Sequence, residues 1–174
     1  MRLHWHRRDL RAGDNRALAP GDGPILPVFV LDESVLDYAS PPRVRFMLDA
    51  LDALRRWYRD RESDLVVARG DPREVVPALA AESDADAVSW AADYSGVARE
   101  RDDAVRRALA DAGVESVVVD DALLFEPGSI TTNAGETYSV FSYFWKKWRD
   151  REKATPVSAP PADALADADA LADA

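Results

Sequence analysis

Side chains that can bind a ligand or a metal ion gather near the start of the chain. Residues 4–15 include His4, His6, Arg7, Arg8, Asp9, Arg11, Asp14 and Asn15. His4 and His6 share one face if this segment is a strand, which would make them a candidate pair of metal ligands. No third ligand follows at metal spacing, so two histidines packed in a strand is the favoured interpretation. We therefore predict no metal site here.

A second charged group stands on a predicted helix. Over residues 97–112 the apolar face runs through Val97, Val105, Ala108, Leu109 and Ala112, and Arg101 falls on that same face. A buried guanidinium needs a carboxylate or a ligand. Asp9 and Asp93 are the available candidates. An arginine–aspartate tie without any ligand is an equally good interpretation.

Several other kinds of site are excluded or weak. The chain has no cysteine, which excludes disulfides, thiolate zinc sites and thiol catalysis. Neither GxGxxG nor GxxxxGK[S/T] occurs, so no ordinary dinucleotide or P-loop site is predicted. Ser139 and Ser142 have no nearby histidine, which argues against a hydrolase triad. The aromatic run over 138–148 could stack bases, but such a helix more often belongs to the core or docks a partner domain.

Strand-like and helix-like segments alternate along the chain. Apolar runs predict strands at residues 1–6, 25–31, 64–70, 86–93 and 114–121. Periodic patterns predict a helix after Pro41–Pro42, one capped by Asp71, and one over 97–112 closed by Gly113. Pro77 is expected to end or kink the second of these early. Shorter helices are expected over 14–19, capped by Asp14 or Asn15, and from about Ser139.

This alternation predicts an α/β fold with a five-stranded, doubly wound parallel sheet and helices on both faces, Rossmann-like but without the glycine fingerprint. Such sheets bind ligands at the carboxyl ends of their strands. That edge should collect Arg8 and Asp9, then Phe29, Val30 and Leu31, then Asp93. We expect Arg8 to face this edge and Arg7 to turn to the other side.

The composition is strongly acidic. The 174 residues carry a net charge of −10, and the only lysines are Lys146, Lys147 and Lys153. Abundant aspartate with almost no lysine is typical of proteins adapted to high salt, although a compositional bias of the genome is the alternative. Such a surface does not suit sequence-independent phosphate binding. No apolar run reaches the length of a membrane span, so we expect a cytoplasmic protein without a membrane partner.

Four stretches together resemble a known family. WHRRDLRAGDNRAL is similar to the signature W-F/H-R-R-D-L-R-x-x-D-N-x-A-L at the N-terminus of the DNA photolyase and cryptochrome family. GDPREVVPALA, ARERDDAV and GETYSVFSYFWKKW resemble further segments of that family in the same order. The resemblance is to the α/β antenna domain of the photolyases, in a form similar to that of haloarchaea.

The resemblance implies a division of the chain. Residues 1–135 would form the antenna domain, 136–155 an aromatic helix leading out of it, and 156–174 an acidic, Ala- and Pro-rich interdomain linker or disordered tail. The family's second domain, which is helical and binds FAD, is absent from this sequence. FAD and damaged DNA would then be bound through that domain, which would be the partner of this chain.

The resemblance also implies a site for a light-harvesting chromophore. Relatives hold either a deazaflavin in the α/β domain or a folate at the domain interface, and the Asn-Glu pair of the folate group is missing from the SGVAR segment here. We therefore expect 8-hydroxy-5-deazaflavin in preference to methenyltetrahydrofolate. The implied chromophore-binding residues are Arg8, Phe29, Val30, Leu31, Arg43, Met47, Asp93 and Arg101. Those expected to form a structural polar cluster are Asp9, Asp14, Asn15 and Asp102.

Three functions remain open at this stage. The first is a light-harvesting and scaffold domain of a photolyase that repairs cyclobutane pyrimidine dimers by electron transfer from FAD, with no catalytic residue in this chain. The second is the corresponding domain of a cryptochrome photoreceptor, and the third a stand-alone module that binds a small molecule. Exposed Tyr143, Phe144 and Trp148 could also promote self-association where a helical domain would dock.

The charge generates a first prediction. Because surface carboxylates repel one another in dilute buffer, folding should require molar salt. We expect the melting temperature, followed by circular dichroism, to rise strongly between low-salt buffer and concentrated KCl. Equal melting temperatures in the two solutions would contradict adaptation to salt.

Overall fold

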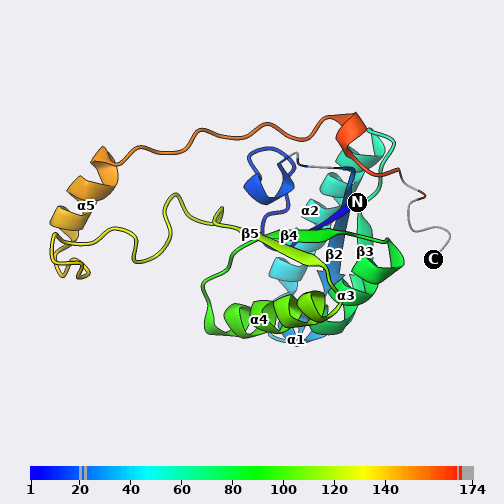
Figure 1. The fold of residues 1–174 in the computed structure, drawn as a ribbon, viewed down its shortest axis with the longest axis horizontal. Coiled ribbons are helices and arrows are strands. Elements are labelled where there is room, and N and C mark those ends of the chain that lie inside the picture. Colours follow the sequence, from blue (N-terminus) through cyan, green and yellow to red (C-terminus); the bar gives the residue numbers. More distant parts are fainter. Residues whose placement is uncertain (20, 22, 168, 170–174) are drawn as a thin grey trace.

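The computed structural model describes residues 1–19, 21, 23–167 and 169. Five parallel strands form one sheet in the order β3-β2-β1-β4-β5 (Figure 1). The chain therefore runs outward from β1 on one side, then crosses back and continues on the other, as predicted for a doubly wound sheet. The strands are β1 (Arg2–His6), β2 (Ile25–Leu31), β3 (Val66–Arg69), β4 (Ala87–Ala91) and β5 (Glu115–Val119).

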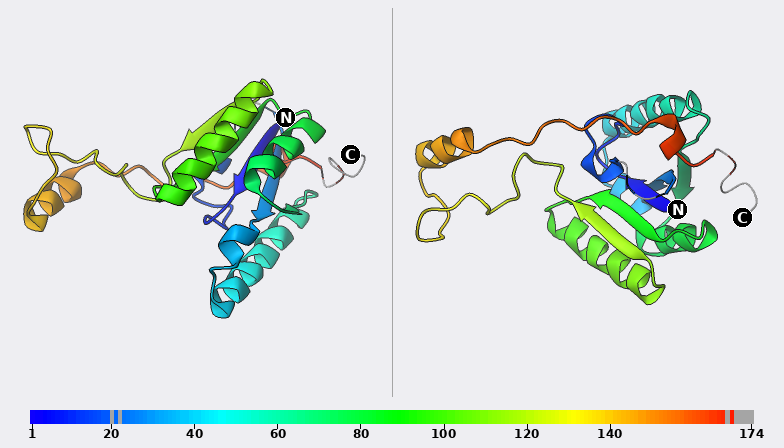
Figure 2. Two further views of the ribbon diagram at one scale, coloured as in Figure 1. Left: turned by 90° about the horizontal axis from the view of Figure 1, so that it is seen from below. Right: turned by 45° about the horizontal axis from the view of Figure 1, so that its top comes forward.

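Helices cover both faces of the sheet (Figure 2). The helix α2 lies on one face, and α3 and α4 lie together on the other. The bounds are α1 (Glu33–Leu36), α2 (Pro41–Arg59), α3 (Pro72–Glu82), α4 (Gly96–Asp111) and α5 (Phe141–Asp150), with 3-10 turns η1 (Arg16–Leu18) and η2 (Ala162–Ala164). The predicted fold class is confirmed.

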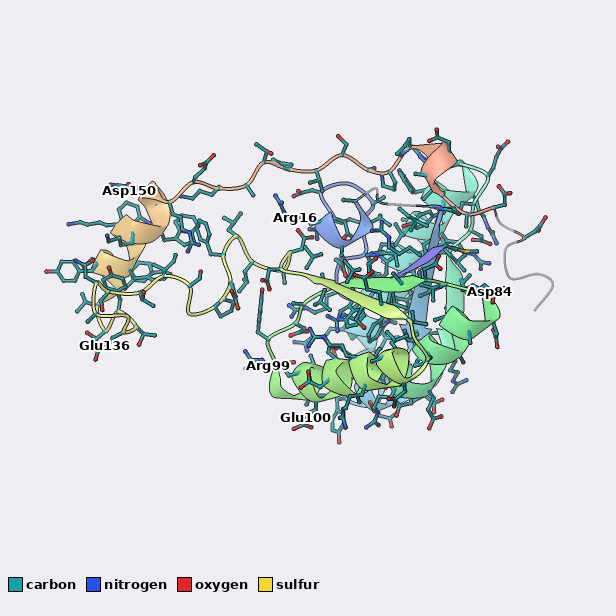
Figure 3. The ribbon with its side chains drawn as sticks, in the orientation of Figure 1. Arg16, Asp84, Arg99, Glu100, Glu136 and Asp150 are labelled. Atoms are coloured by element: carbon teal, nitrogen blue, oxygen red, sulfur yellow. The ribbon has the colours of Figure 1, made fainter. Side chains whose placement is uncertain are left out.

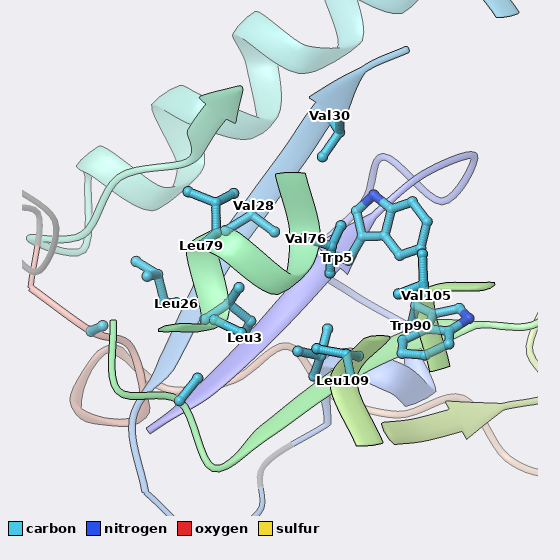
Figure 4. Packing of buried hydrophobic residues seen from close by; sticks show 14 residues of the cluster. Leu3, Trp5, Leu26, Val28, Val30, Val76, Leu79, Trp90, Val105 and Leu109 are labelled. Carbon is cyan, nitrogen blue, oxygen red and sulfur yellow. The ribbon is translucent and has the colours of Figure 1, made fainter. Parts of the chain in front are cut away.

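The period of two along β1 separates the two halves of the interior. Leu3 and Trp5 point toward α3 and α4, where they pack with Val105 and Leu109 (Figure 4). His4 and His6 point to the opposite face and are fully buried there. The central strand is thus apolar on one side and carries the two histidines on the other.

The helix α3 corrects one prediction. Asp71 caps it and Pro72 lies at its start, as predicted, but the helix passes through Pro77 and ends only at Glu82. Pro77 removes a single backbone donor. Val76, Leu79 and Ala80 are buried against the sheet on either side of it. That burial stabilises the helix beyond the proline.

Helix α5 lies well away from the sheet, at the end of a long excursion of the chain (Figures 1 and 2). None of its residues is buried. Figure 3 shows charged side chains around it and around the outside of the body, including Asp150 and Glu100. It begins at Phe141 after Val140, two residues later than predicted. Among the described residues, no helix has the length and apolar character needed to cross a membrane.

The chain after α5 returns to the body in extended form (Figure 1). Asp14 and Val157 are paired through the Asp14 amide and the Val157 carbonyl at 2.8 Å, and Leu165 forms a parallel bridge with Ile25. Leu165 is 7% exposed and packs in the apolar cluster on the α2 side. The segment predicted as linker or tail therefore adds a buried leucine to the core, while residues 168 and 170–174 lie outside the described part.

This contact generates a prediction. Leu165→Ala should lower the free energy of unfolding by about 2–3 kcal/mol, because it removes a buried side chain and leaves a cavity. Leu123→Ala is the matched control, since Leu123 is 52% exposed and should change stability by less than about 0.5 kcal/mol. Urea titration in concentrated KCl measures both. Equal effects would mean that the returning segment does not contribute to the fold.

Candidate functional site

A cavity of 490 Å³ lies at the carboxyl ends of β1 and β2. Helices α1 and α2 form one side of it, and Pro72 and Arg101 close the other. Seven of the eight residues that the sequence assigned to a chromophore line it, namely Arg8, Phe29, Val30, Leu31, Arg43, Met47 and Arg101. The remaining lining residues are Trp5, His6, Arg7, Leu10, Asp32, Val35, Leu36, Phe46 and Pro72.

The walls of the cavity are apolar and its charged groups are mostly positive. Phe29 and Val30 are each 6% exposed and form part of its surface together with the other apolar lining residues. Asp32 is the single carboxylate in the lining, and it caps α1 by accepting a hydrogen bond from the Ser34 amide at 3.0 Å. Four arginines are also among the lining residues, Arg7, Arg8, Arg43 and Arg101. The first and last pair with Asp102, and Arg8 pairs with Asp93. In a chain of net charge −10, such a cavity attracts an anionic or electron-rich ligand.

One buried ion pair holds the inner wall. Arg7 Nη1 lies 2.6 Å from Asp102 Oδ1, and the two side chains are only 8% and 6% exposed. Arg7 also donates to the carbonyl of Ala91 at the end of β4. The Trp90 indole donates to the other Asp102 oxygen at 3.2 Å. Burial lowers the pKa of Arg7, while Asp102 opposes that effect.

Two expectations about the arginines are corrected here. Arg101 pairs with its neighbour Asp102 at 3.2 Å, and not with Asp9 or Asp93. Arg7, expected on the other side, is the arginine that turns inward, while Arg8 is 77% exposed. The reason is that Arg7 follows Trp5 on the face toward α4, where its guanidinium lies 5.0 Å from the centre of the Trp5 ring and meets Asp102.

Asp93 does not line the cavity. It lies in a neighbouring polar pocket of 180 Å³ between the ends of β1 and β4, where its carboxylate is 3.3 Å from Arg8 Nη1. Arg11 and Asp121 face the same pocket and pair at 3.0 Å. Although partial burial opposes it, hydrogen bonds from the Ser95 amide and from Arg8 lower the pKa of Asp93. Its place in the structure is that of a partner for Arg8.

The buried histidines form a hydrogen-bonded network under the cavity. His4 Nδ1 is 3.1 Å from the Ser89 hydroxyl, and His6 Nε2 is 2.8 Å from the Tyr58 hydroxyl. The Asn15 amide nitrogen lies 3.4 Å from His4 Nε2 and donates to Asp9 Oδ2 at 2.9 Å. Burial lowers the pKa of both histidines, that of His4 strongly. The fold also brings Asp9 beside the two histidines, a third ligand that the sequence spacing did not indicate, with the ligand atoms of the three within 4.8 Å of one another. The Asn15 amide nitrogen occupies contacts with His4 and Asp9 that a cation would have to replace.

The expected polar cluster divides into separate parts. Asp9 and Asn15 belong to the histidine network, and Asn15 also caps η1 by accepting from the Leu18 amide at 3.1 Å. Asp14 is exposed and pairs with Val157. Asp102 lies on α4 and pairs with Arg7, which follows β1. These carboxylates therefore stabilise different contacts and do not form one site.

Comparison with known proteins identifies the family. Residues 2–162 match the family model for DNA photolyase. The chain belongs to this family. It is 54% identical to a deoxyribodipyrimidine photo-lyase of Halobacterium salinarum over 99% of this chain and 38% of that protein. It is 39% identical to the enzyme of the same name from a Synechococcus species, over 91% of this chain and 34% of the relative.

Solved structures of the photolyase family agree with this fold. A class III photolyase from Agrobacterium tumefaciens superposes with a TM-score of 0.81 at 27% identity, over 99% of this chain and 37% of that one. A Sulfolobus tokodaii photolyase, described with two FAD molecules and an implied novel light-harvesting cofactor, gives 0.80 at 26% identity over 98% of this chain and 40% of that one. The chain thus spans less than half the length of these relatives.

Sequence reasoning missed part of the cavity at the ends of β1 and β2. Trp5, Arg7 and Phe46 were not assigned to it, nor was the short helix α1, which supplies Val35 and Leu36. The sequence did contain a signal for α1, because Asp32 is a favourable N-cap residue and its side chain accepts a hydrogen bond from the Ser34 amide. For Arg7 the available signal was its position two residues after Trp5, on the same face.

Substitution of the adjacent residues Arg7 and Arg8 tests how much each ion pair contributes to stability. Arg7→Gln should lower the free energy of unfolding by about 3 kcal/mol, at the lower end for a buried pair, because Asp102 loses its closest cation but keeps Arg101. Arg8→Gln is the matched control and should cost less than about 1 kcal/mol, since its pair with Asp93 is largely exposed. Urea unfolding at constant KCl compares them. A larger loss for the Arg8 variant would show that the ion pair of Arg7 is not what holds this edge.

Proposed function

We propose that the cavity at the ends of β1 and β2 holds an antenna chromophore, and that the chain is the light-harvesting and scaffold part of a DNA photolyase. The observation that supports this most strongly is a cavity of 490 Å³ with apolar walls and four arginines among its lining residues. Pockets of this size and character take planar, drug-sized ligands. Membership of the DNA photolyase family supplies the context in which such a ligand absorbs light.

The residues fit 8-hydroxy-5-deazaflavin as the ligand. Its flat tricyclic ring suits the space beside Phe29, Val30 and Met47, and its ionisable hydroxyl and ring carbonyls suit guanidinium donors. Within the described residues, Arg43 forms no ion pair, so its charge is available to such an oxygen. When bound, the deazaflavin would supply absorption of near-ultraviolet and blue light and transfer of excitation energy. The protein groups hold the ring, exclude water from it and balance its negative charge.

Folate is the weaker candidate for this cavity, because the loop and helix start at 95–99 contain neither Asn nor Glu. Asp93, expected as a contact to the deazaflavin, lies outside the lining and does not support that assignment. A cryptochrome role is supported by a Cryptochrome-1 that is 32% identical over 86% of this chain. The photolyase of Halobacterium salinarum, at 54%, favours the repair function. We therefore retain photolyase as the proposal and cryptochrome as the alternative.

The longer relatives indicate what completes the function. We propose that a helical domain that binds FAD repairs pyrimidine dimers in DNA, and that the present chain does not contact the lesion. Of the three aromatic residues expected to be exposed on α5, only Tyr143 is, because Phe144 and Trp148 are half-buried. The exposed side chains of α5 are Phe141, Tyr143 and Trp145, and they suit the docking of that domain. Without it, the same side chains would favour association with a second copy. Because the proposed substrate is DNA, we place the protein in the cytoplasm.

Titration with 8-hydroxy-5-deazariboflavin tests the proposal. We expect saturable binding in concentrated KCl, seen as a shifted absorption band and raised fluorescence anisotropy. Arg43→Gln should weaken binding about tenfold, because a charge-assisted hydrogen bond is lost. Arg45→Gln is the matched control on the same helix. Arg45 pairs with Asp49 at 3.0 Å and does not line the cavity.

The outcomes separate the chromophores. Binding of methenyltetrahydrofolate or of a flavin, without binding of the deazaflavin, would correct the identity of the ligand. Equal losses for the Arg43 and Arg45 variants would contradict the assigned cavity. Asp93→Ala should have a smaller effect than Arg43→Gln, since Asp93 acts only through Arg8.

A further inference from the structure

Trp5 is the one indole in the lining of the cavity, and guanidinium groups surround it. Its side chain is 2% exposed. The Arg7 guanidinium carbon lies 5.0 Å from the centre of the Trp5 ring, and that of Arg101 lies 5.1 Å from it. Both arginines are held there by the same carboxylate, Asp102. Two cations and one anion leave this environment with a net positive charge.

An indole beside a light-absorbing ligand has a chemical consequence. Indole is among the most easily oxidised side chains, and an excited aromatic ligand is a strong one-electron oxidant. One electron can leave the π-system of Trp5 and enter the excited ligand, so that Trp5 becomes a radical cation and the ligand is reduced by one electron. No bond is formed or broken, and return of the electron restores both partners. The excitation energy is lost as heat.

We propose that Arg7 and Arg101 protect the excited chromophore from this loss by making Trp5 difficult to oxidise. A guanidinium over a neutral indole is attracted to the negative face of the ring. Once the indole carries a positive charge, the same contact becomes repulsive, and burial weakens the screening by water. The positive charges thus destabilise oxidised Trp5 while they stabilise the neutral side chain. This inference rests on the proposed function of the cavity.

The neighbouring indole has a different environment. Trp90 is fully buried, and its ring centre lies 5.8 Å from that of Trp5, so it is the next site to which a positive charge could move. The Arg106 guanidinium carbon lies 5.9 Å from the centre of the Trp90 ring, but the Trp90 N–H also donates to the Asp102 carboxylate at 3.2 Å, and this anion favours a positive charge on Trp90. Because Trp90 does not line the cavity, the protection depends on the two guanidinium groups over Trp5. Trp5 can form a rigid aromatic wall without acting as a quencher.

The fluorescence lifetime of bound 8-hydroxy-5-deazariboflavin tests this inference, measured at saturating occupancy. Arg101→Gln should shorten the lifetime about twofold or more, because Trp5 becomes easier to oxidise. Arg101→Lys keeps a cation near the ring and should shorten it less. The decisive comparison is with Trp5→Phe. The double variant Trp5→Phe/Arg101→Gln should have the same lifetime as Trp5→Phe alone, since phenylalanine is a poor electron donor.

The possible results are distinct. A lifetime unchanged by Arg101→Gln, or a shortening that persists when Trp5 is replaced, would overturn the inference although the ligand still binds. Absence of saturable binding to the unaltered chain would overturn the proposed function and this inference with it. Circular dichroism establishes that each variant is folded. Arg101→Met supplies a second neutral variant if Arg101→Gln does not fold.

Discussion

The ion pair between Arg7 and Asp102 is the contact on which the arrangement of the cavity depends. It joins the loop that follows β1 to the middle of α4, and Arg7 also reaches the carbonyl of Ala91 at the end of β4. Without Asp102 the buried Arg7 would lose its counter-charge, and without Arg7 the carboxylate of Asp102 would keep only the weaker contact with Arg101, so the two segments are held together. Once Arg7 is fixed, the direction of the chain at Arg8 is fixed as well. The cavity on one side and the polar pocket on the other are separated by this pair of arginines.

The two faces of β1 explain why the edge above it can be both apolar and charged. Trp5 extends the apolar core to the lining of the cavity, whereas His6 on the opposite face ends a network that includes Tyr58 and Asp9. Each histidine nitrogen has a hydrogen-bond partner, so the network is satisfied without a ligand. It supports the floor of the cavity from below. The groups that could bind a ligand in the cavity are therefore mainly its arginines.

The sequence was sufficient to predict the secondary structure elements, because apolar periodicity determines them. The five strands, the crossover helices and seven lining residues of the cavity follow from apolar runs, caps and family motifs. Contacts between residues distant in the sequence were not predictable. The choice of Arg7 over Arg8 depends on Asp102, which is 95 residues away. The passage of α3 through Pro77 and the return of Leu165 to Ile25 likewise depend on tertiary packing, which overrides the local signal.

The contrast between the acidic surface and the cationic cavity has a consequence in concentrated salt. At about 1 M the screening length falls to about 3 Å, which weakens the mutual repulsion of surface carboxylates and also the long-range attraction of the cavity for an anion. Affinity for the proposed chromophore would then come from direct contact between a guanidinium and a ligand oxygen and from packing of the ring against apolar walls. The buried pair of Arg7 and Asp102 is little affected, because water and ions do not reach it. A protein adapted to salt therefore needs a preformed, close-fitting cavity whose charges are fixed by internal contacts, and the arrangement around Asp102 supplies one.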